Sequence, residues 1–157
     1  MMKNKDYTNI LNQEPSELLK LQKNNGKQLS FIGDVAYSIL TLLRCQQKMF
    51  YDICPYFEIG KGWGGLSLGW FFICCSDASE KTKCHEVGHT LQNANIGGWK
   101  MLGLSLASVI RYWYYTLCNI DWSTYDLWWF EGQATEVGTK YVHLRKNKLN
   151  KGYDKNE

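Results

Sequence analysis

The stretch Cys84-His85-Glu86-Val87-Gly88-His89-Thr90-Leu91-Gln92 holds two histidines four residues apart, with a glutamate between them. On a helix, residues at this spacing share a face, so both imidazoles can bind one ion. Neutral imidazole suits zinc, and the glutamate can accept a proton from a zinc-bound water. The chain has only three histidines, so this spacing favours a metal site over histidines that merely pack or face water. We expect His85 and His89 to bind Zn2+ and Glu86 to act as the general base.

The residues flanking this stretch predict the helix that carries it. Asp77 precedes Glu80 by three residues, which is the spacing of a capping box. Asn95 is followed by glycines at positions 97 and 98, which together form a stop signal. We therefore expect a helix over residues 78–95.

The remaining segments predict an α+β fold that is mainly helical. Long apolar segments predict three more helices, over residues 34–44, 99–117 and 125–144. The first of these, capped by Asp34, should lie buried at the back of the core. Aromatic and aliphatic segments predict two strands that pair in a short antiparallel sheet, over residues 48–59, interrupted at Pro55, and 66–75.

A catalytic zinc ion needs a third protein ligand and one open position. The candidates are the remaining histidine and four carboxylates, namely His143, Asp121, Asp126, Glu131 and Glu136. We expect Glu131, because Glu131, Thr135 and Gly138 share one face of the helix over 125–144. A glycine on that face lets this helix approach the histidine helix closely.

Two of the other candidates fit less well on the same helix. Glu136 lies on a different face from Glu131, so both cannot easily bind one ion. His143 lies more than three helical turns beyond Glu131, which places it far from the ion if the helix is continuous. We expect both side chains to be surface groups.

With these residues the sequence resembles the gluzincins, the thermolysin-like clan in which a later glutamate completes the HExxH site. A metzincin would need glycine and histidine where this chain has Gln92 and Asn95. The interval from Glu131 to Gly138 matches the clan's glutamate helix, although Thr135 stands where aspartate is usual. The chain is also similar, over roughly residues 60–142, to small uncharacterised bacterial HExxH proteins that look like a stripped gluzincin core.

The resemblance implies a zincin-like core and a zinc-dependent metallopeptidase that hydrolyses peptide bonds in a peptide or protein substrate. It also implies an edge strand that binds the substrate backbone, formed by Leu66, Ser67, Leu68 and Gly69. Peptide hydrolysis further needs a donor for the oxyanion. Tyr125 is the expected donor, and the other candidates are Tyr112, Tyr114 and Tyr115.

Length and composition indicate one domain with short polar ends. The chain has 157 residues, 45% of them hydrophobic, which suits a single core. We expect a polar arm over 1–28, a zincin-like domain over 29–145 and a charged tail over 146–157. The net charge is +3 and basic residues cluster near the ends, so no nucleic-acid partner is expected. The polar start lacks a signal peptide's apolar core, and the six cysteines contain no CxxC pair, which together favour a cytoplasmic protein with free thiols.

Two other functions stay open at this stage. One is a metal-stabilised structural or interaction protein, such as a component of a larger cellular or viral assembly. The other is a membrane-associated peptidase with a peripheral membrane contact through residues 96–118. That segment carries Lys100 and Arg111, which disfavours a membrane span. The sequence does not specify the oligomeric state.

Overall fold

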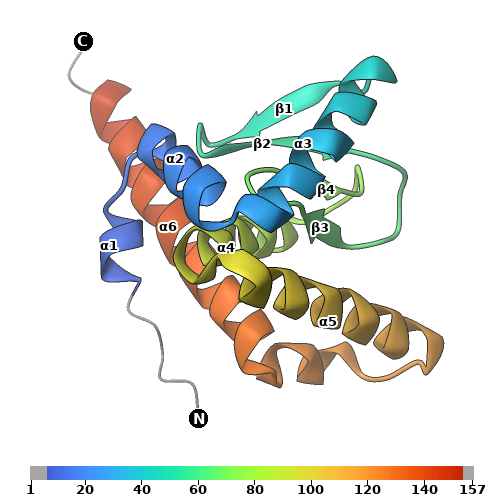
Figure 1. The fold of residues 1–157 in the computed structure, drawn as a ribbon. Coiled ribbons are helices and arrows are strands. Elements are labelled where there is room, and N and C mark those ends of the chain that lie inside the picture. The colour runs from blue at the N-terminus through green and yellow to red at the C-terminus, as the bar shows by residue number, and fades with distance from the viewer. Residues whose placement is uncertain (1–6, 154–157) are drawn as a thin grey trace.

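Helices make up most of the fold, and a small sheet packs beside them (Figure 1). The computed structural model describes residues 7–153, with side chains described as far as residue 150. Its helices are α1 (Thr8–Leu11), α2 (Pro15–Asn25), α3 (Lys27–Leu42), α4 (Glu80–Ile96), α5 (Gly98–Leu117), the 3-10 helix η1 (Trp122–Leu127) and α6 (Trp129–Tyr153). Its strands are β1 (Gln47–Phe50), β2 (Cys54–Glu58), β3 (Gly65–Ser67) and β4 (Phe72–Cys74). The expected α+β class with mostly helical content is confirmed.

Helix α4 carries the two histidines and packs against α6, α2 and β3. It begins where Ser79 Oγ accepts a hydrogen bond of 3.1 Å from the Thr82 backbone N–H, which caps its first turn. It ends before Gly97, whose φ of 61° is a conformation that favours glycine. The helix expected here is confirmed to within two residues at each end. The expected cap Asp77 is wrong, because its Oδ1 instead accepts a hydrogen bond from the Gly62 backbone N–H.

Helices α4 and α6 cross at a contact made by two glycines. A Cβ atom on Gly138 would lie 2.0 Å from the carbonyl oxygen of Cys84. A Cβ atom on Gly88 would lie 1.9 Å from the carbonyl oxygen of Ala134. Neither distance is tolerable between a carbon and a backbone oxygen, so no other residue fits at either position without moving a helix. The close approach expected from the glycine on the Glu131 helix is thus confirmed.

The sheet is mixed, which corrects the expected antiparallel pair of strands. Its strand order is β1-β2-β4-β3, with β2 and β4 parallel and the other neighbours antiparallel. Each expected strand is in fact two strands, because the chain turns at Tyr51 and Asp52, with φ of 49° and 54°, and at Gly69, with φ of 83°. Pro55, the expected interruption, lies inside β2 opposite Met49. Strand β3 forms one edge of the sheet and contacts α4.

The polar ends pack on the core more than expected. In the arm predicted over 1–28, α2 lies on α4, and its Leu18 side chain is buried in the core. Gln22 is also buried, and its Nε2 donates a hydrogen bond to the Thr90 carbonyl. Residues on both sides of the boundary expected at residue 29 therefore belong to one core. Residues 1–6 of the arm and 154–157 of the tail lie outside the described residues, and α6 continues through most of the rest of the tail.

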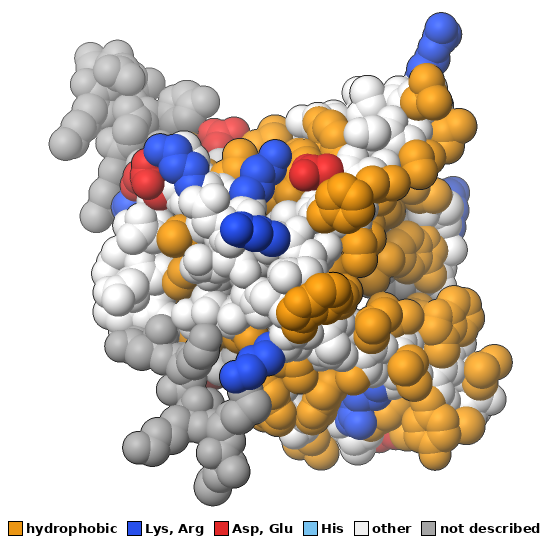
Figure 2. Space-filling model, viewed as in Figure 1, with side chains coloured by type: hydrophobic (Ala, Val, Ile, Leu, Met, Phe, Trp, Pro, Cys, Tyr) orange, Lys and Arg blue, Asp and Glu red, His pale blue; other side chains and the backbone are white. Residues whose placement is uncertain are grey.

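Helix α3 begins seven residues earlier than expected and lies at the surface instead of the back of the core. Gly26 precedes its first residue, and Asp34 lies inside the helix, where its Oδ1 accepts a hydrogen bond from Trp70 Nε1. Leu29, Gly33 and Leu40 face inward. The opposite side is apolar and exposed, and hydrophobic side chains gather on the side of the molecule where α3 and α5 lie (Figure 2).

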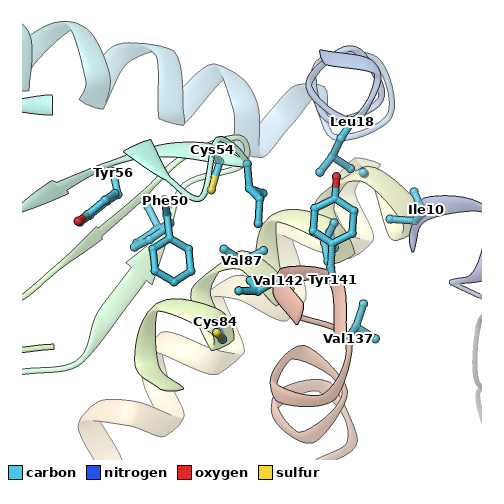
Figure 3. Close-up of a cluster of buried hydrophobic side chains, with 14 of the residues drawn as sticks. Ile10, Leu18, Phe50, Cys54, Tyr56, Cys84, Val87, Val137, Tyr141 and Val142 are labelled. Atoms are coloured by element: carbon cyan, nitrogen blue, oxygen red, sulfur yellow. The ribbon is translucent and has the colours of Figure 1, made fainter. Parts of the chain in front are cut away.

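The main core fills the space between the sheet and helices α1, α2, α4 and α6. Val87 of α4 is fully buried and lies beside Val142 of α6, with Phe50 on the sheet side (Figure 3). Leu18 of α2 and Ile10 of α1 close the other end of this cluster. The helix that carries the histidines is thus packed on several sides, which fixes the position of its polar face.

Candidate metal centre

Three ligand atoms from α4 and α6 converge on one point. His85 Nε2 lies 3.1 Å from Glu131 Oε2, and His89 Nε2 lies 3.2 Å from the same oxygen. The two Nε2 atoms are 3.1 Å apart. Among the described residues, these three side chains form the one group of three or more histidines, cysteines or carboxylates that could hold a metal ion.

The separations of these atoms fit a tetrahedral zinc ion. A zinc–nitrogen bond of about 2.0 Å with tetrahedral angles puts neighbouring ligand atoms about 3.3 Å apart. The three measured separations are 3.1 to 3.2 Å. The other carboxylate oxygen, Glu131 Oε1, is buried and has no hydrogen-bond partner among the described residues. Two imidazoles and a carboxylate are a common ligand set for catalytic zinc, so the residues present fit the ion.

Hydrogen bonds on the far side of each ring orient the imidazoles. Thr135 Oγ1 donates to Asp126 Oδ1 at 3.3 Å, so it is free to accept from His85 Nδ1 at 2.8 Å. Gln92 Nε2 donates to the Phe130 carbonyl at 2.8 Å, which turns Gln92 Oε1 toward His89 Nδ1, also at 2.8 Å. Each Nδ1 atom therefore donates a hydrogen bond on the far side of its ring, which leaves each Nε2 atom facing the shared point, where it can bind a cation once it has given up its proton.

Charge and burial act against each other at this site. Burial would raise the pKa of the fully buried Glu131 carboxyl, but the hydrogen bonds with His85 and His89 dominate and hold it well below its usual range. Burial likewise opposes a charged His89, yet hydrogen bonding to Glu131 raises the pKa of His89. Protonation of His89 and binding of a cation at this point therefore compete.

Glu86 lies between the histidines and the edge strand β3. Its side chain is buried, and burial raises its pKa, while the neighbouring histidines oppose that shift. A Cβ atom on Gly65 would lie 2.6 Å from Glu86 Oε1, so the glycine leaves room for the carboxylate. Glu86 Oε2 has no hydrogen-bond partner among the described residues. One oxygen of this carboxylate therefore has no proton donor within the described part of the chain.

A cavity of about 510 Å³ opens over these groups. One wall is β3, and the opposite wall is α5 with η1. The lining outside the metal group combines apolar and aromatic side chains with hydroxyl and charged groups, and the large apolar ones include Trp63, Leu66, Val109, Trp113 and Trp122. A cavity that joins apolar walls to a few polar groups is the usual make-up of a small-molecule or peptide site.

The residues expected to bind substrate fall into two groups. Leu66 and Ser67 belong to β3 and line the cavity. Leu68 and Gly69 instead form the turn after β3 and pack on α3, where a Cβ atom on Gly69 would lie 2.9 Å from Ser30. That half of the expected strand is corrected, because the turn at Gly69 directs the chain away from the cavity.

The four tyrosines considered as oxyanion donors also fall into two groups. Tyr125 and Tyr112 both line the cavity. Burial raises the pKa of Tyr125, which keeps its hydroxyl protonated and able to donate a hydrogen bond. Tyr114 is exposed, and Tyr115 packs under Arg111 with its hydroxyl beside Thr124.

Of the other candidate ligands, Asp126 lines the cavity and accepts the hydrogen bond of Thr135, and the remaining three lie away from the metal group. Glu136 and His143 are exposed, as expected, and His143 Nε2 is 3.1 Å from Asn147 Nδ2. Asp121 caps η1 by accepting a hydrogen bond from the Ser123 backbone N–H.

Sequence reasoning missed the orienting roles of Gln92 and Asp126. Gln92 could have been suspected, because it follows His89 by three residues on the same helix. Asp126 gave no local signal, since it acts through Thr135 from the end of η1. Comparison of the chain with protein families, with curated proteins and with solved structures finds no match.

Proposed function

We propose that this chain is a zinc-dependent metallopeptidase of gluzincin type, with His85, His89 and Glu131 as zinc ligands. The observation that carries the proposal is the convergence of two oriented Nε2 atoms and one carboxylate oxygen, with Glu86 and its unpartnered oxygen beside them. The cavity above the group adds space for a substrate.

In this proposal each residue has a distinct task. When bound, zinc supplies Lewis-acid activation of water and of the scissile carbonyl. Glu86 accepts a proton from the attacking water and returns it to the leaving amine. Tyr125, from the cavity wall, donates a hydrogen bond to the oxyanion. The free edge of β3 binds an extended substrate backbone by strand addition, with Leu66 and Ser67 nearest the cavity.

The direct test is Glu86→Gln, which keeps the shape of the side chain and removes the base. The protein is incubated with a complex peptide mixture, and cleavage products are identified by mass spectrometry. We expect the native chain to cleave, and the variant to bind zinc normally but cleave roughly 100-fold to 10,000-fold more slowly. Full activity in the variant would exclude Glu86 as the base, and no cleavage by the zinc-loaded native chain would count against the whole proposal.

A second test displaces the Glu86 side chain without substituting it. Gly65→Ala would put a Cβ atom 2.6 Å from the Glu86 carboxylate and displace it. Gly64→Ala is the matched control, because its nearest neighbour is Tyr112 at 3.6 Å, an ordinary contact. We expect Gly65→Ala to lower the cleavage rate while leaving zinc content unchanged. Equal rates for the two variants would argue that the position of Glu86 is not critical.

The alternative proposal is a metal-stabilised interaction protein on the same fold. The exposed apolar side of α3 and α5 favours it, since such surfaces often contact partners. The alternative predicts that removing zinc with a chelator lowers the melting temperature, and that no peptide in the mixture is cleaved.

A further inference from the structure

Two helices present apolar stripes to solvent instead of to the core. On α3 the stripe is spaced by three or four residues and contains Phe31, Val35, Ile39 and Leu42. On α5 the corresponding stripe contains Trp99, Leu106, Ile110, Trp113 and Leu117. The most exposed of these, Leu42 and Leu117, are 82% and 78% accessible. Each stripe follows one side of its helix, so it is a continuous surface and not a scatter of single residues.

The two stripes lie on the same side of the molecule. Helices α3 and α5 contact one another, and hydrophobic side chains gather over both in Figure 2. We call the nine residues of the two stripes the apolar face. A surface of this extent is unusual on a free protein and marks an interaction site.

The charges around the apolar face are mainly positive. Helix α5 contains no acidic residue, and its Lys100 is exposed, whereas Arg111 is half-buried and donates hydrogen bonds to Tyr115 and Thr124. Helix α3 begins with Lys27, and the exposed Arg44 follows its end. The single acidic residue of α3, Asp34, lies 3.7 Å from Lys23 Nζ and accepts the Trp70 hydrogen bond, so its charge is balanced.

We propose that the apolar face binds the surface of an anionic lipid bilayer, with α3 and α5 lying in the plane of the interface. Amphipathic helices with aromatic and aliphatic residues on one side and basic residues at the margin bind membranes in this way. Trp99 and Trp113 supply the aromatic rings that favour the headgroup region. Among the described residues, no helix is both long and apolar enough to cross a bilayer.

This arrangement places the metal centre close to the membrane. Trp113 lines the cavity and also belongs to the apolar face. The cavity mouth therefore lies beside the bound surface. Membrane binding itself does not depend on the metal or on hydrolysis, so it can be tested separately from the proposed function.

The test is co-sedimentation of the full chain with vesicles of phosphatidylcholine alone or mixed with phosphatidylserine. The double variant Ile39→Ser with Ile110→Ser removes one large side chain from each stripe. The control double variant, Leu19→Ser with Leu144→Ser, changes exposed leucines on α2 and α6. We expect binding to the anionic vesicles to weaken roughly tenfold or more for the first variant and to be unchanged for the second.

A charge variant and a mass measurement complete the test. Lys27→Glu with Lys100→Glu should weaken binding to the anionic vesicles roughly tenfold or more, because each basic residue near such a surface contributes about 1 kcal/mol. Native protein that stays in the supernatant, or that binds neutral vesicles equally well, would overturn the proposal. A dimer by analytical ultracentrifugation that dissociates in the Ile39→Ser, Ile110→Ser variant, without vesicle binding, would assign the face to a second copy instead.

Discussion

Two regions of the molecule place their side chains in opposite ways: one is the contact between α4 and α6, and the other is the outer sides of α3 and α5. At the contact between α4 and α6, Gly88 and Gly138 bring the two backbones together, and the polar side chains between the helices are buried. On the apolar face, large hydrophobic side chains point away from the core. The chain thus buries polar groups in one place and exposes apolar groups in another.

Each of these two arrangements has a cost in folding free energy. A buried polar atom without a partner costs about 1 to 3 kcal/mol, and both Glu86 and Glu131 have such an atom. An exposed leucine forgoes about 1.5 to 3 kcal/mol of burial. Both regions would gain free energy from a partner outside the chain. We infer a metal ion for the first region and a lipid surface for the second.

The largest expected difference between the two regions is in thiol reactivity. Burial raises the pKa of Cys84, at the helix contact, to about 11, so at pH 8 about one such thiol in a thousand is ionised. Cys118 follows α5 and is exposed. We expect iodoacetamide to label Cys118 quickly and Cys84 very slowly, with the Cys84 rate rising as pH rises toward 11. Peptide mass spectrometry measures both, and equally fast labelling would show that the helix contact is open.

A single methyl group should disrupt the helix contact. Gly138→Ala would place a carbon 2.0 Å from a backbone oxygen, and we expect it to lower the free energy of unfolding by about 3 kcal/mol. Gly103→Ala on α5 is the control, since nothing lies within 4 Å of its added carbon. We expect that variant to be more stable by about 0.5 to 1 kcal/mol. Urea unfolding measures both, and similar values for the two would contradict the close crossing.

Loosening one imidazole should weaken metal binding without removing a ligand. Thr135→Val deletes the hydroxyl that accepts from His85 Nδ1, and we expect zinc affinity to fall about 10-fold to 100-fold. Thr139→Val changes an exposed threonine on the same helix and should have no effect. Competition with a fluorescent chelator gives both affinities. Unchanged affinity in Thr135→Val would mean that the hydroxyl does not orient the ring.

The smallest effect should come from the apolar face. Because Ile39 is about half exposed, Ile39→Ser should change the free energy of unfolding by less than about 0.5 kcal/mol. Urea unfolding of the variant checks this value. A loss of several kcal/mol would show that the face is part of the core, and the membrane proposal would lose its basis.

The sequence allowed the helix contact to be predicted better than the rest of the fold. Local signals set the start and end of α4, and spacing on one helix was enough to select Glu131 and Gly138. The sheet was harder, because the left-handed turn at Tyr51 and Asp52 uses no glycine, and the parallel pairing of β2 with β4 depends on distant residues. The spacing of His89 and Gln92 could be read from the sequence. The role of Gln92 in orienting the His89 ring could not, because it depends on where the Phe130 carbonyl lies.

The apolar face shows a different limit of sequence reasoning. An apolar stripe on α3 has the same period whether it faces the core or solvent. The segment was therefore expected to be buried, and only its packing revealed that Phe31 and Leu42 are exposed. Conversely, the polar residues of α2 gave no sign that Leu18 and Gln22 complete the core.

Zinc content per chain, measured by elemental mass spectrometry on the native protein and three variants, decides whether His85, His89 and Glu131 form a metal centre. We expect about one zinc ion in the native chain and in Glu136→Ala, which changes an exposed glutamate on the same helix. We expect the ion to be lost or strongly reduced in His85→Ala and Glu131→Ala. A folded native protein without zinc, or variants that retain it fully, would contradict the assignment of these residues as a metal centre.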